Sequence, residues 1–281
     1  MKKTSVFVPG KVIIVGEHAV VYGKMALVAS ISLGVRVQVV EREGTEKTDI
    51  VKKAIEVAGG DDKTQVKIDS NLPIGSGLGS SAAVAAAVIK AVRAYLKKPI
   101  NNDELFSLTM ECEKIAHGNA SGIDPACVVY GGLIAFRKGQ PFERLKIVKP
   151  IKLLLVNSGK PAESTKEMVE LVALNPDRLK IVGRIEELVE QVKERLVKGE
   201  GIADLLNMNG LLLERMGVVG KFAKKLSDEL RTMGCSVKIT GAGGVRSGSG
   251  IMIVMVPDLA KIKKLLDNRK INYFETVIGT K

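Results

Sequence analysis

Residues 73–83 read PIGSGLGSSAA, and this glycine- and serine-rich run has the composition of a phosphate-binding loop. Glycine adopts backbone angles that other residues avoid, and its lack of a side chain lets a ligand approach the chain closely. The run leads into an alanine-rich segment that is predicted to be helical from Ser80, and the unpaired N–H groups of a helix N-terminus attract phosphate. No lysine follows the last glycine, so the run is not a Walker A loop. The alternative is a tight turn in which Ser80 or Ser81 caps the helix.

A second candidate segment, PGKVIIVGEHAVVYG, occupies residues 9–23. Lys11 is predicted to leave a tight turn before a buried strand, and that strand ends at Glu17 and His18. The chain has two histidines. The acidic neighbour and the turn glycine beside His18 favour a ligand-binding role over a structural one. His117 precedes a glycine at a predicted helix end, where a protonated histidine is favourable, and is interpreted as structural.

A third segment, EKIAHGNASGIDP, occupies residues 113–125. Glu113 lies in the last turn of a predicted helix, and Asp124 ends the polar loop that follows. Phosphoryl transfer needs one acid to hold Mg²⁺ and another near the attacking hydroxyl, and these two carboxylates are candidates for those roles. The alternative is a helix stop followed by an Asx-type turn.

The elements that must position these segments mix strands and helices. Stretches rich in Val and Ile predict strands over residues 5–8, 12–15, 26–40 and 65–69, and helices are predicted over 47–58, 80–96 and 102–116. A second portion begins near Pro150 with a short buried strand over 153–156. Four amphipathic helices are predicted next, over 165–174, 176–197, 202–216 and 218–233. Strands over 236–240, 250–256 and 272–277, with a helix over 258–267, complete the chain. Strands and helices do not alternate strictly, which indicates an α+β fold with domains 1–150 and 151–281.

The amino-acid composition indicates which kinds of ligand and partner the protein is expected to bind. The net charge is +12, which suits an anionic ligand. Nucleic-acid binding is not expected, because the Lys and Arg residues form no basic tail and are not interleaved with aromatic residues. Three well-separated cysteines indicate neither a zinc site nor a disulfide framework and fit a reducing cytoplasm. The N-terminus has no secretory signal, and the longest apolar run, residues 82–89, is too short to span a bilayer. We expect a soluble cytoplasmic protein without a membrane partner.

Together, PGKVIIVGEHAVVYG, PIGSGLGSSAA and KITGAGG resemble the three motifs of the GHMP kinases, in that family's order. GEHAVVYG followed by EKIAHGNASGID is similar to the family's mevalonate kinase branch, whereas galactokinases tend to read GEHTD and phosphomevalonate kinases GEY. The resemblance covers most of the chain and implies a two-domain GHMP kinase fold. Residues 1–150 would resemble the ribosomal protein S5 domain 2-like fold and bind ATP, and residues 151–281 would be ferredoxin-like. The implied reaction is ATP-dependent phosphorylation of mevalonate to 5-phosphomevalonate in isoprenoid biosynthesis.

The resemblance also implies roles for single residues. Asp124 would sit beside the substrate hydroxyl with Lys11 close to it, and Ser81 and Glu113 would hold Mg²⁺. The ATP phosphates would be wrapped by Pro73, Ile74, Gly75, Ser76, Gly77, Leu78, Gly79, Ser80, Ser81, Ala82 and Ala83. Mevalonate would be bound by Glu17, His18, Ser121, Thr165, Gly241, Ala242 and Gly243. The family further implies a homodimer.

Two departures from the family pattern bear on the site. The third motif usually continues as a run of glycines, whereas Val245 and Arg246 follow Gly244 here. Either the loop is rearranged, or Arg246 adds a cation near the phosphates. A milder departure is Ala120, which stands where proline is common.

Three rival functions remain open from the sequence. The nearest is another GHMP kinase, acting on phosphomevalonate, galactose or homoserine. A nucleic-acid-binding protein of related fold would use the basic surface instead of the glycine-rich loops. A non-catalytic metabolite sensor would not need Lys11, Glu113 and Asp124 together.

Overall fold

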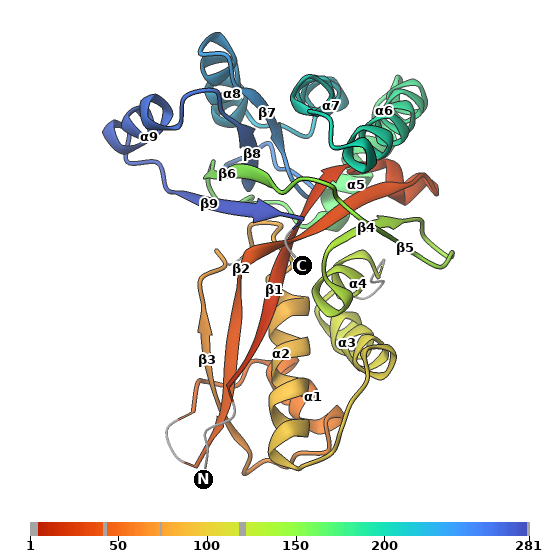
Figure 1. Ribbon diagram of the computed structural model, residues 1–281, viewed down its shortest axis with the longest axis vertical. Helices are drawn as coiled ribbons and strands as arrows, with labels where there is room; N and C mark the ends of the chain where they lie inside the picture. The colour runs from red at the N-terminus through yellow and green to blue at the C-terminus, as the bar shows by residue number, and fades with distance from the viewer. Residues whose placement is uncertain (1–4, 42–43, 74, 118–121, 280–281) are drawn as a thin grey trace. The chain divides into compact units, whose positions relative to one another are not determined.

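The computed structural model describes residues 5–41, 44–73, 75–117 and 122–279 and divides into two compact units (Figure 1). The first unit comprises Met1–Lys11, Ser30–Ile74 and Gly79–Gly131, and the second comprises Val12–Ala29, Gly75–Leu78 and Gly132–Lys281. Helices and strands are mixed without strict alternation, so the predicted α+β class is confirmed. The division into domains 1–150 and 151–281 stays a prediction.

Two long strands, β1 (Ser5–Val15) and β2 (Ala26–Val40), contribute residues to both units. The strand order of their sheet is β1-β2-β4-β5, with β3 paired to β2. The predicted turn at Pro9 and Gly10 does not form, because β1 continues through both residues. Proline lacks an N–H group and is tolerated in a strand at the end of a sheet's order, which is where β1 lies.

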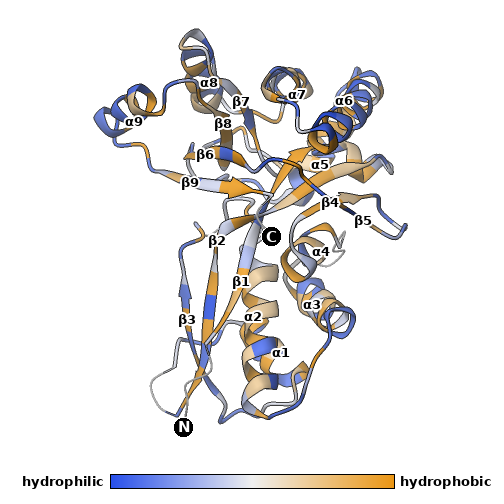
Figure 2. Cartoon of the chain, in the orientation of Figure 1, coloured by the Kyte–Doolittle hydropathy of each residue, from blue (hydrophilic) through white to orange (hydrophobic). Residues whose placement is uncertain are grey.

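Four helices and strand β3 (Gln65–Ser70) complete the first unit. Its helices are α1 (Asp49–Val57), α2 (Ser80–Tyr95), α3 (Asn102–His117) and α4 (Ile123–Tyr130). Helix α2 contacts the other three helices. Most of its residues are apolar, as its colour in Figure 2 shows, and it buries nine of them, six being alanine. Small side chains let the surrounding helices approach α2 closely, so the predicted alanine-rich helix forms the centre of this unit.

The second unit contains a sheet with the strand order β7-β8-β6-β9, in which neighbours are antiparallel. Its strands are β6 (Ile151–Asn157), β7 (Ser236–Ile239), β8 (Ile251–Met255) and β9 (Tyr273–Ile278). The helices are α5 (Thr165–Leu174), α6 (Arg178–Lys198), α7 (Ala203–Met216), α8 (Lys221–Thr232) and α9 (Leu259–Asn268). Helices α7 and α8 pack on β7, and a Cβ at Gly210 would lie 2.1 Å from the Val237 carbonyl oxygen, so only glycine fits there.

Several short elements were not predicted. They are the 3₁₀ turn η1 (Ala19–Tyr22), helix α4, and strands β4 (Leu133–Phe136) and β5 (Glu143–Leu145). Each is at most eight residues long, too short for hydrophobic periodicity to mark it. The remaining predicted helices and strands are confirmed to within a few residues at their ends.

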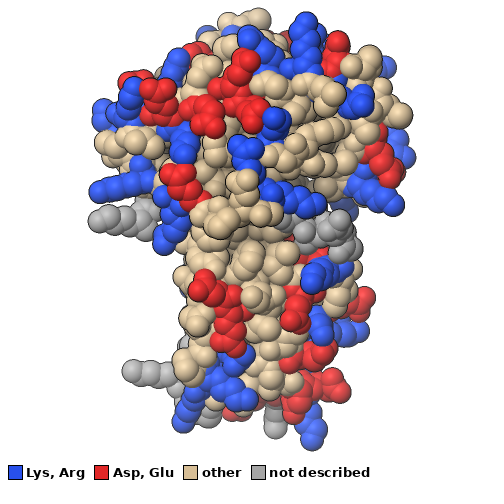
Figure 3. Space-filling view, turned by 90° about the vertical axis from the view of Figure 1, so that its right-hand side faces the viewer, with Lys and Arg blue, Asp and Glu red and all other residues tan. Residues whose placement is uncertain are grey.

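The face of the molecule drawn in Figure 3 carries both basic and acidic side chains. On this face, acidic side chains lie among the basic ones. Within the part of the chain that the structure describes, no helix combines the length and apolar character needed to cross a bilayer.

Candidate active site

The site is built around an ion pair between Lys11 and Asp124 in the first unit. Lys11 Nζ lies 2.8 Å from Asp124 Oδ1. The Lys11 side chain is 3% exposed and that of Asp124 is 30% exposed. A buried ammonium therefore fixes one carboxylate oxygen while the carboxyl group keeps access to solvent, as a group that meets a substrate hydroxyl must.

Asp124 owes its position to helix α4. Gly122 caps this helix in a left-handed conformation, with a φ of 87°, and Asp124 lies in the first helical turn. The sequence predicted a polar loop ending in an Asx-type turn as the alternative for this segment. The structure shows a helix start, and a negative charge is favourable at that end of a helix.

The N-terminus of α2 lies beside Lys11. Gly79 caps α2 with a φ of 70°, and a Cβ at this residue would lie 2.8 Å from Lys11 Cγ. A side chain at Gly79 would therefore displace the lysine. Ser80 and Ser81 are the first two helical residues and Gly79 is the cap, so the serines do not cap the helix as the alternative reading of this run had them.

Glu113 lies on α3, which packs against α2, and is 3% exposed. A buried carboxylate is costly unless a cation or hydrogen bonds compensate its charge. Together with the hydroxyl of Ser81 on α2, it offers hard oxygen donors of the kind that Mg²⁺ prefers. The chemistry of the predicted pair therefore fits a magnesium ion.

The rest of the glycine-rich run, Gly75–Leu78, belongs to the second unit and packs there against the third motif. The backbone N–H of Ile251 donates to the Ser76 carbonyl oxygen at 3.3 Å. A Cβ at Gly77 would lie 2.9 Å from the Thr240 carbonyl oxygen. The absence of side chains thus lets the second and third motifs touch through their backbones.

A buried ion pair joins the first motif to strand β7, which contains the first two residues of the third motif. Lys238 on β7 pairs with Glu17, and both side chains are fully buried. Lys238 Nζ also donates to the Ile13 carbonyl oxygen at 3.0 Å, and the Ile13 N–H donates to Thr240 Oγ1 at 2.9 Å. Lys238 thus fixes Glu17 and also connects β7 to Ile13 of β1, within the second unit.

His18 connects the same two motifs directly. It lies 2.9 Å from the Ala242 carbonyl oxygen through Nε2. Because a carbonyl only accepts, Nε2 carries the hydrogen and Nδ1 is left as an acceptor in the neutral ring. Burial lowers the pKa of His18 to about 4, against the opposing effect of this hydrogen bond. The ring is therefore neutral at physiological pH and has one acceptor nitrogen to offer a hydroxyl group.

The backbone at His18 is unusual. Its φ is 58°, in the left-handed region that residues with side chains rarely adopt. The turn that begins there is η1, which leads the chain from β1 toward β2. A strained conformation of this kind persists only where the surroundings fix it, and it is common at ligand-binding positions.

The structure also gives the positions of the remaining predicted site residues, except for two that it does not describe. Thr165 is the first residue of α5 and is exposed, and Pro73 lies just before the glycines. Leu78, Ala82 and Ala83 are fully buried and support the loop from the core. Ile74 and Ser121 lie outside the described residues.

Comparisons with known proteins identify the family. The GHMP kinases N terminal domain matches residues 48–132. The mevalonate kinase of Archaeoglobus fulgidus is 34% identical over 262 residues, which cover 84% of this chain and 88% of that protein. The mevalonate kinase of Pyrococcus furiosus is 32% identical, covering 89% and 88%. The chain belongs to the mevalonate kinases of the GHMP kinase family.

Solved structures extend this assignment to the fold. Methanococcus jannaschii mevalonate kinase superimposes with a TM-score of 0.83 at 24% identity, covering 99% of this chain and 98% of that one. A structure of L. major mevalonate kinase in complex with R-mevalonate gives a TM-score of 0.84 at 24% identity, covering 99% and 96%. The GHMP kinase fold implied by the three motifs is therefore confirmed.

Three residues of this GHMP kinase were missed by the sequence reasoning. Lys238 lies inside the quoted motif KITGAGG but received no role, although a lysine between Val237 and Ile239 in an apolar strand signals a buried charge that needs a partner. Glu163 and Glu167, which lie on either side of the predicted substrate residue Thr165, contact Arg246. Nothing in the sequence pairs these acids with a residue about 80 positions away.

Proposed function

We infer that this chain transfers the γ-phosphoryl group of ATP to the primary hydroxyl of mevalonate, giving 5-phosphomevalonate and ADP. The observation that supports this most directly is the Lys11–Asp124 pair beside the N-terminus of α2. A carboxylate for the hydroxyl and a helix start for the phosphates are thus next to each other within one unit. Phosphoryl transfer relies mainly on such positioning and on charge stabilisation.

Asp124 would accept or orient the proton of the substrate hydroxyl as its oxygen attacks the γ-phosphorus. The support is its accessibility, since the carboxyl group is part exposed while its partner is buried. The Lys11 ammonium would hold the carboxylate oxygen in place and offset the negative charge that develops in the transition state. The bond from the γ-phosphorus to the bridging oxygen of ADP breaks, and ADP leaves with that electron pair.

The ATP phosphates would be bound by the glycine-rich run, from Pro73 to Ala83. The support is the start of α2, where the N–H groups of the first turn have no partner within the helix. Magnesium would be held by Ser81 and Glu113, and when bound it would neutralise charge on the β- and γ-phosphate oxygens.

Mevalonate carries a carboxylate and a tertiary hydroxyl besides the alcohol that is phosphorylated. His18 would accept a hydrogen bond from a substrate hydroxyl through Nδ1, supported by its neutral ring and its Nε2 contact to Ala242. Glu17, Ser121, Thr165 and the backbone of Gly241–Gly243 would complete the substrate-binding set.

A coupled assay of ADP release tests the proposal. The purified protein is supplied with ATP, Mg²⁺ and, in separate reactions, mevalonate, phosphomevalonate, galactose or homoserine. We expect a kcat/KM for mevalonate at least about 100-fold above the others, a discrimination of about 3 kcal/mol. Equal rates with two substrates, or a preference for another alcohol, would overturn the assignment.

The cellular setting is part of the same proposal. We propose that the enzyme works in the cytoplasm as a homodimer and without a nucleic-acid partner. The three cysteines are free thiols, which supports a reducing compartment. The homodimer rests on the family resemblance.

A further inference from the structure

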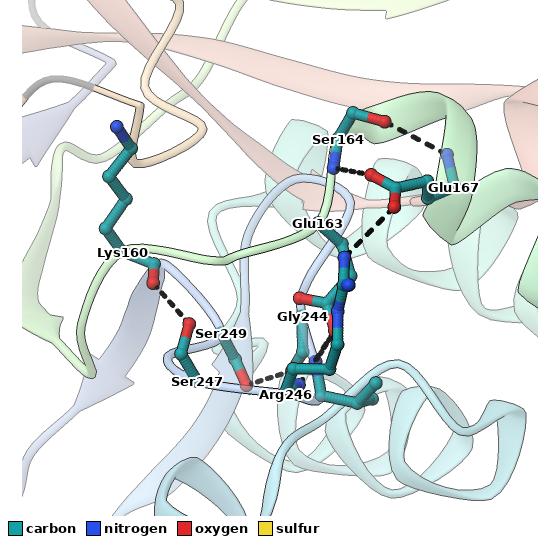
Figure 4. Close-up of polar contacts among 9 residues, drawn as sticks. Lys160, Glu163, Ser164, Glu167, Gly244, Arg246, Ser247 and Ser249 are labelled. Carbon is teal, nitrogen blue, oxygen red and sulfur yellow. Dashed lines mark hydrogen bonds and ion pairs between the residues drawn. The ribbon is translucent and has the colours of Figure 1, made fainter.

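The third motif of this chain carries a charged side chain at Arg246, where the family pattern has a bare backbone. Figure 4 shows how the structure accommodates it. Arg246 Nε lies 3.1 Å from Glu163 Oε1, and Arg246 Nη2 lies 3.0 Å from Glu167 Oε1. One guanidinium thus bridges two carboxylates that precede and follow the Ser164–Thr165 turn.

Glu163 is held by the backbone of the same loop. Its Oε1 accepts hydrogen bonds from the N–H groups of Val245, at 3.2 Å, and Arg246, at 2.7 Å. The Glu163 side chain is 5% exposed. Burial alone would raise the pKa of this carboxyl, but the hydrogen bonds from the loop outweigh it, and the pKa lies below its ordinary value. Glu163 is therefore ionised and fixed at neutral pH.

Glu167 connects Arg246 to the start of α5. The Ser164 N–H donates to Glu167 Oε2 at 2.7 Å, and the Glu167 N–H donates to Ser164 Oγ at 3.2 Å. These two bonds form a capping box, which fixes the first turn of the helix. Thr165, the predicted substrate residue, is the first residue of that turn.

The other end of the loop is anchored as well. Ser247 Oγ donates to the Lys160 carbonyl oxygen at 2.8 Å, and Ser249 Oγ donates to the Gly244 carbonyl oxygen at 2.8 Å. The Gly220 N–H donates to Ser249 Oγ at 2.8 Å. The loop is thus a defined structure with contacts on both sides, and Arg246 is its link to α5.

The ion pairs of Arg246 can affect either the stability of the protein or the position of its substrate-binding residues. The Arg246 side chain is 60% exposed, and exposed ion pairs contribute little to the free energy of unfolding. A displacement of a substrate-positioning group by about 1 Å, in contrast, can lower a rate about 100-fold. Losing the link would therefore change substrate binding more than it changes unfolding.

We propose that Arg246 is a positioning residue that, through Glu163 and Glu167, holds the Ser164–Thr165 turn in place for mevalonate. This inference rests on the proposed function, because Thr165 matters only if the turn meets the substrate. It also decides between the two meanings of the departure at Arg246. The guanidinium charge is taken up by two carboxylates, so it serves the loop and the substrate turn rather than the ATP phosphates.

The kinetic test compares four variants of the full-length enzyme. Arg246→Ala removes the link, and Arg246→Lys keeps a cation. Glu167→Gln keeps the capping box, because glutamine also serves at that position, but removes the charge that Arg246 meets. Arg269→Ala is the matched control, since Arg269 forms an exposed ion pair with Glu229 in the same unit, away from this loop in the sequence.

We expect Arg246→Ala to raise the mevalonate KM about tenfold while the ATP KM stays within about twofold, the signature of lost substrate positioning. Glu167→Gln should raise the mevalonate KM about threefold, and Arg246→Lys should restore at least half of the loss. Arg269→Ala should match the wild type. An ATP KM that rises as much as the mevalonate KM, or a mevalonate KM that does not change, would overturn the proposal.

A second measurement works without any substrate. Hydrogen exchange of the Glu167 amide, which donates to Ser164 Oγ, reports the order of the turn. We expect exchange at least about threefold faster in Arg246→Ala than in the wild type or Arg269→Ala. Unchanged exchange would remove the link even if kinetics changed. A wild type that does not phosphorylate mevalonate would refute the proposed function and leave this result as the measure of the link itself.

Discussion

Asp124 and Lys11 show how much a single pair can specify. The lysine is buried and the acid is part exposed. The Lys11 ammonium therefore fixes the Asp124 carboxylate, which keeps access to solvent. An aspartate paired in this way remains an acceptor for a proton while its direction is fixed.

This arrangement predicts the result of Asp124→Asn. The amide keeps the shape of the side chain but cannot take up a proton, so kcat should fall at least about 100-fold, the lower range for acid–base or orienting groups. The ATP KM should change little, because the proposed role is toward the hydroxyl. The measurement is steady-state kinetics of ADP release.

Asp103→Asn is the matched control for this variant. Asp103 lies in the same unit and accepts a hydrogen bond from Tyr130 at 2.5 Å. The same change of charge there should leave kcat within about twofold, as for surface groups outside the site. Near-normal kcat in Asp124→Asn, or an equal loss in both variants, would remove the catalytic assignment.

The buried His18 makes the stability of the folded protein depend on pH. Its pKa is about 4 in the folded protein and 6.5 as the ordinary value, so the unfolded chain binds more protons between these two pH values. Stability therefore rises with pH across this window and is lost as pH falls from about 6.5 toward 4. The full loss amounts to roughly 3 kcal/mol.

We predict that His18→Asn reduces this acid sensitivity. Asparagine tolerates a positive φ better than most residues and carries no titrating group in this range. Urea unfolding at pH 7.5, 6.0 and 5.0 should show a smaller fall in unfolding free energy for the variant than for the wild type. Parallel curves for the two proteins would contradict the assignment of the pH dependence to His18.

At the scale of elements, a buried charge pair joins β7 to the segment that follows β1. Lys238 and Glu17 are both fully buried, and Lys238 also binds the Ile13 carbonyl oxygen. Removing one partner of a buried pair leaves an uncompensated charge, whereas removing both costs far less.

Lys238→Met should therefore destabilise the protein by about 3–5 kcal/mol, and Lys238→Met combined with Glu17→Gln should recover most of that loss. The measurement is the urea midpoint at constant slope. If the double variant were no more stable than Lys238→Met, the pair would not be the reason for the loss. The mevalonate KM of the double variant then reports separately on the proposed substrate role of Glu17.

The start of α2 makes a second prediction at this scale. Gly79→Ala forces a side chain into a left-handed backbone and against Lys11 Cγ. We expect a loss of stability above the roughly 1–2 kcal/mol of a left-handed alanine and at least about tenfold lower kcat, because the displaced lysine no longer holds Asp124.

Gly59→Ala separates the two effects. Gly59 belongs to the same unit and has a φ of 85°, but a Cβ there meets its nearest neighbour at 3.6 Å, an ordinary contact. This variant should lose stability and keep its kcat. Equal kcat values for the two variants would show that contact with Lys11 is unimportant.

The elements differ in how far the sequence determines them. The helices of the second unit have clear amphipathic patterns, and α5 was predicted at the residues where it forms. The continuity of β1 through Pro9 depends on its place at the end of a strand order, which no local pattern contains. The partners of Arg246 and Lys238 likewise depend on which segments the fold brings together. Residue types predicted the chemistry, and the tertiary structure was needed for the supporting contacts.

At the scale of the molecule, neither compact unit is a continuous stretch of chain. Residues 12–29 and 75–78 belong to the second unit although they lie within the first half of the sequence. Val12, Ile13, Ile14 and Val15 are all buried, and Ala26–Ala29 pair with β4.

A fragment of residues 1–131 should therefore be aggregation-prone, because it contains every segment of the first unit together with an orphaned apolar strand pair from the second. Size-exclusion chromatography of the fragment should show mostly large species, and co-expression with residues 132–281 should increase the soluble fraction. A monomeric fragment with a cooperative unfolding transition would contradict this expectation.

The same division has a consequence for how the protein is made. When a ribosome has produced the first 131 residues, all of the first unit is available, but the strand residues 12–29 still lack β4 and everything after it. Ala26–Ala29 meet β4 soon afterwards, but Ile13, Glu17 and His18 contact Thr240, Lys238 and Ala242. The buried segment that begins at Val12 must therefore stay exposed while residues 132–242 are synthesised, which at about 5–20 residues per second takes on the order of ten seconds. A nascent chain of this kind offers a binding site to a chaperone that recognises extended apolar segments, until residues 238–242 emerge and pack against this segment.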